Sequence, residues 1–211
     1  MKIIGLYLGK LTNIGEKRNP TGIYKQSVEQ VSIDELGIIG DTQADKRFHG
    51  GPEKALHQYA LSGYEKIIKR YPLLHKKAKP GMIGENLSVT DMNEHNVCIG
   101  DIYKVGRATL QVSAPRIPCW KIDAKFKQPN LNQFISQHRL NGWYYRVLNG
   151  GVITLNDEFF LQQRPNTELS MDTMLKVIYG EAEEWVVELA TYASGLDPEW
   201  QKRLQKKTPL N

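Results

Sequence analysis

The chain has 211 residues, of which 40% are hydrophobic and 24% are charged, and it carries a formal net charge of +5. This length is typical of one domain with a small appendage, and this composition allows a hydrophobic core beneath a charged surface. The longest apolar runs are far shorter than the ~20 residues that a membrane span needs, and the two cysteines are too few for a disulfide framework.

The N-terminal segment MKIIGLYLGK has neither a long apolar run nor a cleavage site, so we interpret it as a first strand rather than a signal peptide. Two free cysteines favour a reducing, cytoplasmic setting. The basic excess lies largely in loops and in the C-terminal tail. It is typical of a solvated surface, but it also fits attraction of an anionic small molecule such as a phosphorylated cofactor. Nucleic-acid binding ranks last, because the helices show no ordered basic and aromatic face.

Hydrophobic alternation and glycine spacing predict short strands through most of the first half of the chain. The segment 14–26 is polar and contains glycine and proline, which indicates a loop or a hairpin connection. One helix is expected over 62–70, with Ser62 as its N-cap. The expected strands are 2–9, 28–31, 37–40, 54–59 and 84–89.

The middle of the chain predicts a hairpin of strands 101–105 and 108–113, then a stiff segment in which Pro115 and Pro118 flank Arg116. A short helix is expected over 130–137, and strands over 143–148, 151–155 and 158–163. The dipeptide Asn149-Gly150 between two apolar runs predicts a hairpin turn. Many short strands separated by glycine turns, with few inserted helices, indicate a mainly β protein built as a closed β-barrel.

Near residue 165 the apolar period becomes helical. One helix should begin near Met171 and end at Gly180, a second should cover 182–191, and a third should start at Asp197-Pro198. We therefore expect a barrel domain over 1–164 and a three-helix extension over 165–211. A bundle this short buries little surface alone, and it should therefore pack against the barrel or against a second subunit. A homodimer is thus possible.

Residues 40–59, GDTQADKRFHGGPEKALHQY, hold more ionisable side chains than a core can accept, since burial of an unpaired charge costs several kcal/mol. The pair Gly50-Gly51 suits a positive φ, a close approach to a ligand or an anion-binding nest of backbone amides. The segments GENL, residues 84–87, and APRIPCW, residues 114–120, have a similar character. Together they predict one site assembled from three parts of the sequence.

Most of these residues allow both a structural and a functional interpretation. Cys119 suits a soft metal or sulfur transfer, although a free cysteine is more often a small buried side chain, as expected for Cys98. His49 could bind an anion, donate a proton or brace the glycine turn. Asp41 and Asp45 could share a proton or bind a cation, or could cap a turn and pair with Lys46, Arg47 or Lys54. His57 is expected to be a wall residue of a strand.

Basic and amide side chains complete the candidate set. Lys54 and Arg47 are candidate phosphate clamps. Asn86 could hydrogen bond a pterin edge, and Glu85 could orient a cation or lock its loop; both could equally be strand-end braces. The spacing of the histidines fits no zinc pattern, and the glycines fit neither a P-loop nor a dinucleotide fingerprint.

These three segments, in this order, resemble the MOSC family, named for the C-terminal domain of molybdenum-cofactor sulfurases. That family has a G-D-x-x-x-D-x-x-x-H-G-G-x-x-K-A-[VL]-x-x-Y block, then G-E-N-L, then a cysteine after an Arg-rich or Pro-rich turn; here these are residues 40–59, 84–87 and 116–119. The resemblance covers about residues 1–165 and implies a β-barrel related to the one inserted in pyruvate kinase. The tail resembles the three-helix extension of a bacterial subgroup associated with resistance to N-hydroxylated purine analogues.

The resemblance implies a molybdenum-cofactor protein that reduces N-hydroxylated compounds, such as hydroxylaminopurines, to amines. Its electrons would come from a separate reductase, because no flavin or nicotinamide site is expected in this chain. A pyridoxal-phosphate site is not expected either. The alternative is a non-catalytic carrier of the cofactor or of a persulfide on Cys119. Carried over by position, Cys119 is the metal ligand, Cys119 and His49 are catalytic, and the cofactor-binding residues are Asp41, Asp45, Arg47, His49, Gly50, Gly51, Lys54, Glu85, Asn86 and Arg116.

Overall fold

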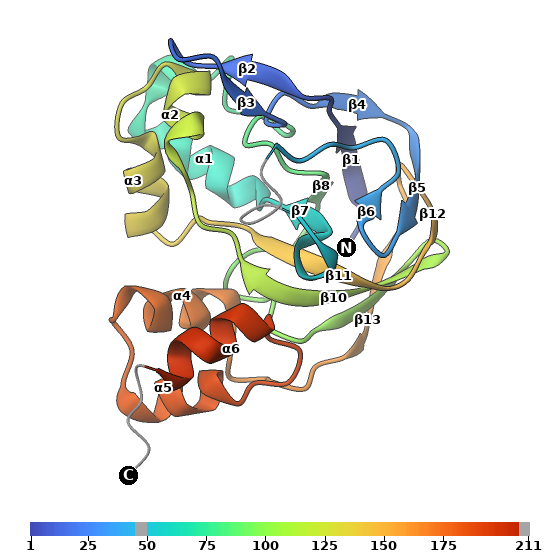
Figure 1. Ribbon diagram of the computed structural model, residues 1–211, viewed down its shortest axis with the longest axis vertical. Helices are drawn as coiled ribbons and strands as arrows, with labels where there is room; N and C mark the ends of the chain where they lie inside the picture. Colours follow the sequence, from blue (N-terminus) through green and yellow to red (C-terminus); the bar gives the residue numbers. More distant parts are fainter. Residues whose placement is uncertain (45–49, 207–211) are drawn as a thin grey trace.

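A computed structural model describes residues 1–44 and 50–206 of the chain (Figure 1). The strands are β1 (Ile3–Leu8), β2 (Thr12–Ile14), β3 (Asn19–Thr21), β4 (Gln26–Val28), β5 (Gln30–Asp34), β6 (Gly37–Ile38), β7 (Leu56–Gln58), β8 (Leu87–Val89), β9 (Ile102–Val105), β10 (Ala108–Pro115), β11 (Trp143–Asn149), β12 (Gly151–Thr154) and β13 (Phe159–Gln163). The α-helices are α1 (Leu61–Arg70), α2 (Trp120–Phe126), α3 (Leu131–Gln137), α4 (Met171–Tyr179), α5 (Glu184–Thr191) and α6 (Pro198–Gln205), with 3₁₀ turns η1 (Pro52–Lys54) and η2 (Pro72–Leu74).

The main sheet has eight strands in the order β13-β9-β10-β11-β7-β8-β1-β4. All its pairs are antiparallel except β7 with β8. Backbone hydrogen bonds of 2.9 Å from Ile3 N to Asp157 O and from Phe159 N to Met1 O connect the start of β1 with the start of β13. Across residues 1–44 and 50–206 no continuous ladder closes the sheet, so the sheet-dominated fold is confirmed while the closed barrel remains a prediction.

Two hydrophobic clusters hold the fold together. The larger one joins the strands to the C-terminal helices, with Tyr103, Trp143, Leu175 and Leu204 among its buried members. The smaller one packs α1, α2 and α3 together through buried aromatic and aliphatic side chains. Figure 1 shows α4, α5 and α6 gathered on one side of the sheet, next to β10. These three helices therefore share one core with the sheet, as expected for a short bundle that cannot bury enough surface alone.

The predicted helix boundaries hold at the C-terminal end of the chain. Ser170 Oγ accepts a hydrogen bond from Thr173 N at the start of α4, and Gly180 ends that helix with a φ of 76°. Asp197 caps α6 by accepting a hydrogen bond from Glu199 N, and Pro198 occupies the first turn. In the described part of the chain no helix is long and apolar enough to cross a membrane.

Two local predictions are wrong, and one helix was not predicted. The segment 120–126 forms the helix α2, which was not expected; its buried Ile122 and Phe126 lie one turn apart, but the helix ends at Lys127 in a left-handed conformation without a glycine signal. Ser62 lies inside the first turn of α1, and Ala60 occupies the cap position. Residues 149–151 form no hairpin, because β11 pairs with β10 and β7 while β12 pairs with β5.

Candidate functional site

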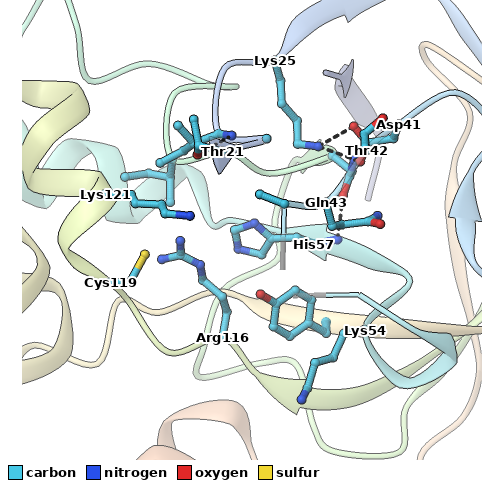
Figure 2. A pocket seen from close by; sticks show the side chains of 17 residues that line it. Thr21, Lys25, Asp41, Thr42, Gln43, Lys54, His57, Arg116, Cys119 and Lys121 are labelled. Carbon is cyan, nitrogen blue, oxygen red and sulfur yellow. Dashed lines mark hydrogen bonds and ion pairs between the residues drawn. The ribbon is translucent and has the colours of Figure 1, made fainter. Parts of the chain in front are cut away.

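The three sequence segments meet at one pocket. Figure 2 labels lining residues of the first and third segments, among them Asp41 and Cys119. Asp41 comes from the turn after β6, Asn86 from the residue before β8, and Arg116 and Cys119 from the connection between β10 and α2. Thr21 at the end of β3, with Gly22, Ile23 and Lys25 after it, forms a further part of the wall. The structure therefore brings these side chains together around one pocket, and their functional roles stay predictions.

Asp41 is a buried structural anchor of the pocket wall. Its carboxylate accepts hydrogen bonds from Gly9 N at 2.7 Å, from Lys25 Nζ at 2.6 Å and from Asn86 Nδ2 at 2.9 Å. Among the described residues its ion-pair partner is Lys25, which was not predicted, while Lys46 and Arg47 lie outside the part of the chain that the structure describes. Burial lowers the pKa of Lys25, and the adjacent Asp41 carboxylate opposes that shift.

Asn86 connects strands β1 and β7 with the turn that carries Asp41. Its Oδ1 accepts a hydrogen bond from His57 N at 3.1 Å, and its Nδ2 donates to Tyr7 O at 3.2 Å as well as to Asp41. Its amide is therefore committed to the protein, which supports the bracing role that the sequence left open. The side chain nevertheless lines the pocket.

Glu85 lies behind the pocket and does not line it. Its fully buried carboxylate accepts hydrogen bonds from Tyr64 Oη at 2.5 Å, Gly81 N at 2.6 Å and Ile83 N at 3.1 Å. Burial raises the pKa of Glu85, and these hydrogen bonds counteract the rise. The arrangement locks the loop 81–85, so the expectation that Glu85 contacts a cofactor is replaced by its alternative, a loop brace.

Arg116 supplies a buried positive charge to the pocket. Its backbone N donates to Gly142 O at 3.1 Å, and its backbone O accepts from Asn141 Nδ2 at 2.9 Å, which fixes the position of the residue. Only 5% of the residue is exposed, and Nη1 has no hydrogen-bond partner among residues 1–44 and 50–206. Figure 2 shows the guanidinium directed into the pocket between Cys119 and His57. A buried donor of this kind calls for an acceptor outside the described residues.

Cys119 lies at the pocket edge and is partly exposed at the N-cap position of α2. Tyr144 lies beside it, and burial raises the pKa of its hydroxyl to about 12, which the Arg116 guanidinium opposes. Cys98 is buried elsewhere, with its Sγ 3.8 Å from Thr167 O. The interpretation of Cys98 as a packing residue is confirmed.

The lysine of the first motif has a partner outside it. Lys54 lines the pocket, and its Nζ lies 3.0 Å from Glu199 Oε2 and 3.5 Å from Asp197 Oδ2 of the α6 start. Gly50 and Gly51 adopt positive φ values of 147° and 79°, as expected, but they do not line the pocket. The predicted site residues Asp45, Arg47 and His49 lie outside the described residues.

Several lining residues were missed or assigned a lesser role from the sequence. Lys25 lies in a segment with no motif. Lys121 directly follows the APRIPCW segment and was considered only as a cation near Cys119; it lines the pocket, and its Nζ donates to Pro20 O at 2.8 Å. His57, expected to be a wall residue, is buried and lines the pocket, with its ring centroid 5.4 Å from that of Tyr144. The alternation of His57 with Ala55 and Tyr59 indicated its strand but not which face the pocket occupies.

The described lining is strongly basic. Four cations, Lys25, Lys54, Arg116 and Lys121, face a single carboxylate, that of Asp41. Such a wall favours an anionic ligand over a cationic one. Among residues 1–44 and 50–206 no cluster of three or more His, Cys, Asp and Glu side chains could hold a metal ion.

Comparisons with known proteins agree with the motifs. A family model described as the MOSC domain matches residues 45–159. Protein YiiM of Escherichia coli strain K12 is 30% identical over 205 residues, which cover 97% of this chain and 91% of that protein. A Gibberella moniliformis protein named "Reductase" is 38% identical over 160 residues, which are 75% of this chain but only 28% of that protein. The crystal structure of YiiM from Geobacillus stearothermophilus matches with a TM-score of 0.80 and 29% identity, covering 97% of each chain.

Proposed function

Because this chain belongs to the MOSC domain family, we propose that its basic pocket binds a phosphorylated molybdenum pterin and that Cys119 is the protein ligand to the metal. The observation that carries the proposal is the buried Arg116 guanidinium, whose Nη1 has no hydrogen-bond partner among the described residues. A phosphate or a pterin carbonyl would provide the missing acceptor.

The donor set of the pocket fits such a group. Arg116, Lys25 and Lys121 supply positive charge for an anionic cofactor, and the Cys119 thiolate is a soft ligand of the kind that molybdenum accepts. Lys25 and Lys121 also hold the 20–25 segment and the turn at Asp41 in place through their own hydrogen bonds. These side chains would bind and orient the cofactor, while the buried Asp41 and Glu85 keep the wall rigid.

The proposed reaction is the two-electron reduction of an N-hydroxylated compound: R–NHOH + 2 H⁺ + 2 e⁻ gives R–NH₂ + H₂O, with cleavage of the N–O bond. The bound metal supplies the two-electron chemistry, and the protein supplies position and exclusion of water. The Tyr144 hydroxyl keeps its proton at neutral pH and lies close to Cys119 and Arg116, so it can hydrogen bond an oxygen there. The name of the Gibberella relative supports a reductive direction. We propose a separate reductase as the electron donor.

The second candidate is a carrier that delivers the cofactor, or a persulfide on Cys119, to another protein. It is favoured by the partial exposure of Cys119 at the pocket edge, where an acceptor could reach the sulfur. A carrier would release its cargo to an apo-acceptor, whereas an enzyme would retain its cofactor through repeated turnover.

The test compares wild type, Cys119→Ser and the control Cys98→Ser after expression in a host that makes the cofactor. Molybdenum and pterin per chain are measured before and after incubation with an N-hydroxylated compound and a reduced viologen dye as the electron donor. The proposal expects near-stoichiometric molybdenum, retained through formation of the amine, in wild type and Cys98→Ser, and loss of turnover in Cys119→Ser. No molybdenum in the wild type, where a known molybdoprotein fills under the same conditions, would overturn it.

A further inference from the structure

A second cavity opens beside the basic pocket, between the start of α2 and the helix α6. Lys54, Cys119, Lys121 and Tyr144 line both cavities. The two cavities therefore meet at the cysteine, so a molecule in the second one can approach the same sulfur from the α6 side. We refer to this second cavity, between Trp120 and Trp200, as the α6 groove.

Flat and apolar side chains form much of the α6 groove. Trp120 is 46% exposed and Ile117 is 39% exposed on the α2 side. Trp200 faces them from α6, where it is partly buried and packs against the main hydrophobic cluster. Two exposed apolar side chains beside a proposed reaction centre are unusual for a surface that contacts only water, and indole rings stack well on flat heteroaromatic rings.

The helix that carries Trp200 is fixed relative to the pocket. Asp197 N donates to Ser113 O at 2.9 Å, which ties the start of α6 to β10. Lys54 Nζ contacts Glu199 Oε2 at 3.0 Å, and the Arg203 guanidinium lies 5.0 Å from the centre of the Trp200 ring. Contacts of residues before and after Trp200 in α6 thus hold its ring in place. This preorganisation reduces the entropy lost when a ligand binds.

We infer that the α6 groove is the substrate subsite of the proposed reductase and that Trp200 determines its specificity, favouring flat heteroaromatic N-hydroxyl compounds over aliphatic ones. This inference rests on the proposed function, since it takes Cys119 as the reacting edge of the site. The aromatic walls hold the ring system of the substrate, and Glu199 and Arg203 at the rim can hydrogen bond ring nitrogens. The C-terminal helices therefore contribute to substrate choice as well as to the core.

The test uses cofactor-loaded wild type, Trp200→Leu and Trp185→Leu. Leucine keeps an apolar side chain against the core and removes only the flat ring, while Trp185, 56% exposed on α5, lies outside the groove and is the matched control. Calorimetric titration with 6-hydroxylaminopurine, without an electron donor, measures binding separately from reduction. Turnover of 6-hydroxylaminopurine and of N-methylhydroxylamine is then measured with a reduced viologen.

We expect Trp200→Leu to weaken binding of 6-hydroxylaminopurine and to raise its KM by about tenfold, with N-methylhydroxylamine turnover unchanged. Trp185→Leu should match the wild type. Equal binding by Trp200→Leu and wild type, or an equal loss on both substrates, would overturn the inference. Binding that depends on Trp200 in a protein that reduces neither compound would uphold the subsite and contradict the proposed reduction.

Discussion

Lys25 Nζ lies 2.6 Å from both carboxylate oxygens of Asp41, and the two side chains are only 5% and 1% exposed. This buried ion pair joins the 20–25 segment to the turn after β6, on the wall of the basic pocket. Neither charge is solvated, so each depends on the other to offset its cost of burial. The first motif thus contributes to the site partly by stabilising the wall.

Removal of one charge of this pair should be costly. We expect Asp41→Asn to lower the free energy of unfolding by about 3–5 kcal/mol, because Lys25 would remain buried without its counter-charge. Urea unfolding of Asp41→Asn, Lys25→Met and the double variant measures the coupling. The double variant should be more stable than Asp41→Asn alone, and a loss below about 1 kcal/mol in Asp41→Asn would contradict the assignment.

Two buried tyrosines provide a matched pair of predictions. Tyr64 Oη donates to Glu85 at 2.5 Å and accepts from Ile83 N at 3.0 Å, whereas Tyr59 Oη is buried without a hydrogen-bond partner in the described part of the chain. Tyr64→Phe should lower the free energy of unfolding by about 1–3 kcal/mol, because it leaves a buried carboxylate short of a donor. Tyr59→Phe should change it by less than about 0.5 kcal/mol or stabilise the fold. Equal losses in denaturant unfolding would refute this distinction.

Glu94 should make stability depend on pH. Burial raises its pKa from 4.5 to about 6, although its carboxylate accepts a hydrogen bond from Gly142 N at 3.0 Å. Between these two pH values the folded chain binds more protons than the unfolded chain, so the contribution of Glu94 is present below pH 4.5 and is lost as the pH rises through 6.

The variant Glu94→Gln retains the acceptor for Gly142 and does not titrate. The free energy of unfolding of the wild type should therefore fall by about 1.5 kcal/mol more than that of Glu94→Gln between pH 4.5 and 6.5. Denaturant unfolding at several pH values checks this. Parallel curves for the two proteins would show that Glu94 does not titrate in that range.

We expect the Arg116 side chain to contribute to cofactor binding and not to the free energy of unfolding. Its buried guanidinium leaves Nη1 without a hydrogen bond from the described residues, so Arg116→Met should leave the free energy of unfolding of the cofactor-free protein unchanged or raised. Pterin content after expression in a cofactor-producing host should fall at least about tenfold, given that a charged hydrogen bond contributes ~1.5–3 kcal/mol. The exposed Arg70→Met is the matched control. Normal pterin content in Arg116→Met would exclude Arg116 from the cofactor site.

The strands and the C-terminal helices could largely be predicted from the sequence, because alternation, glycine turns and the caps at Gly180 and Asp197 are local signals. The helix α2 could not, because it is short and ends at Lys127 without a glycine. The hairpin predicted at Asn149-Gly150 does not form, because the strands on its two sides pair with β10 and β5, which lie far away in the sequence. Tertiary pairing overrode a local turn preference.

At the site, the motifs correctly brought Asp41, Asn86, Arg116 and Cys119 together. They did not reveal which polar groups face the pocket, since a strand-end carboxylate such as Glu85 has the same sequence signal whether it points inward or outward. Lys25 was missed because an isolated lysine in a loop has no periodicity, and only the fold places it against Asp41.

The most direct test of the central claim is the sulfur coordination of molybdenum in the loaded protein, measured by X-ray absorption at the metal edge. Cys119 lies beside the buried cation Arg116 at the junction of the two cavities, where a thiolate ligand would hold the metal. The account predicts about one sulfur ligand fewer in Cys119→Ser than in wild type, with Cys98→Ser unchanged. The same sulfur coordination in all three proteins would contradict it, because the metal would then be held without Cys119.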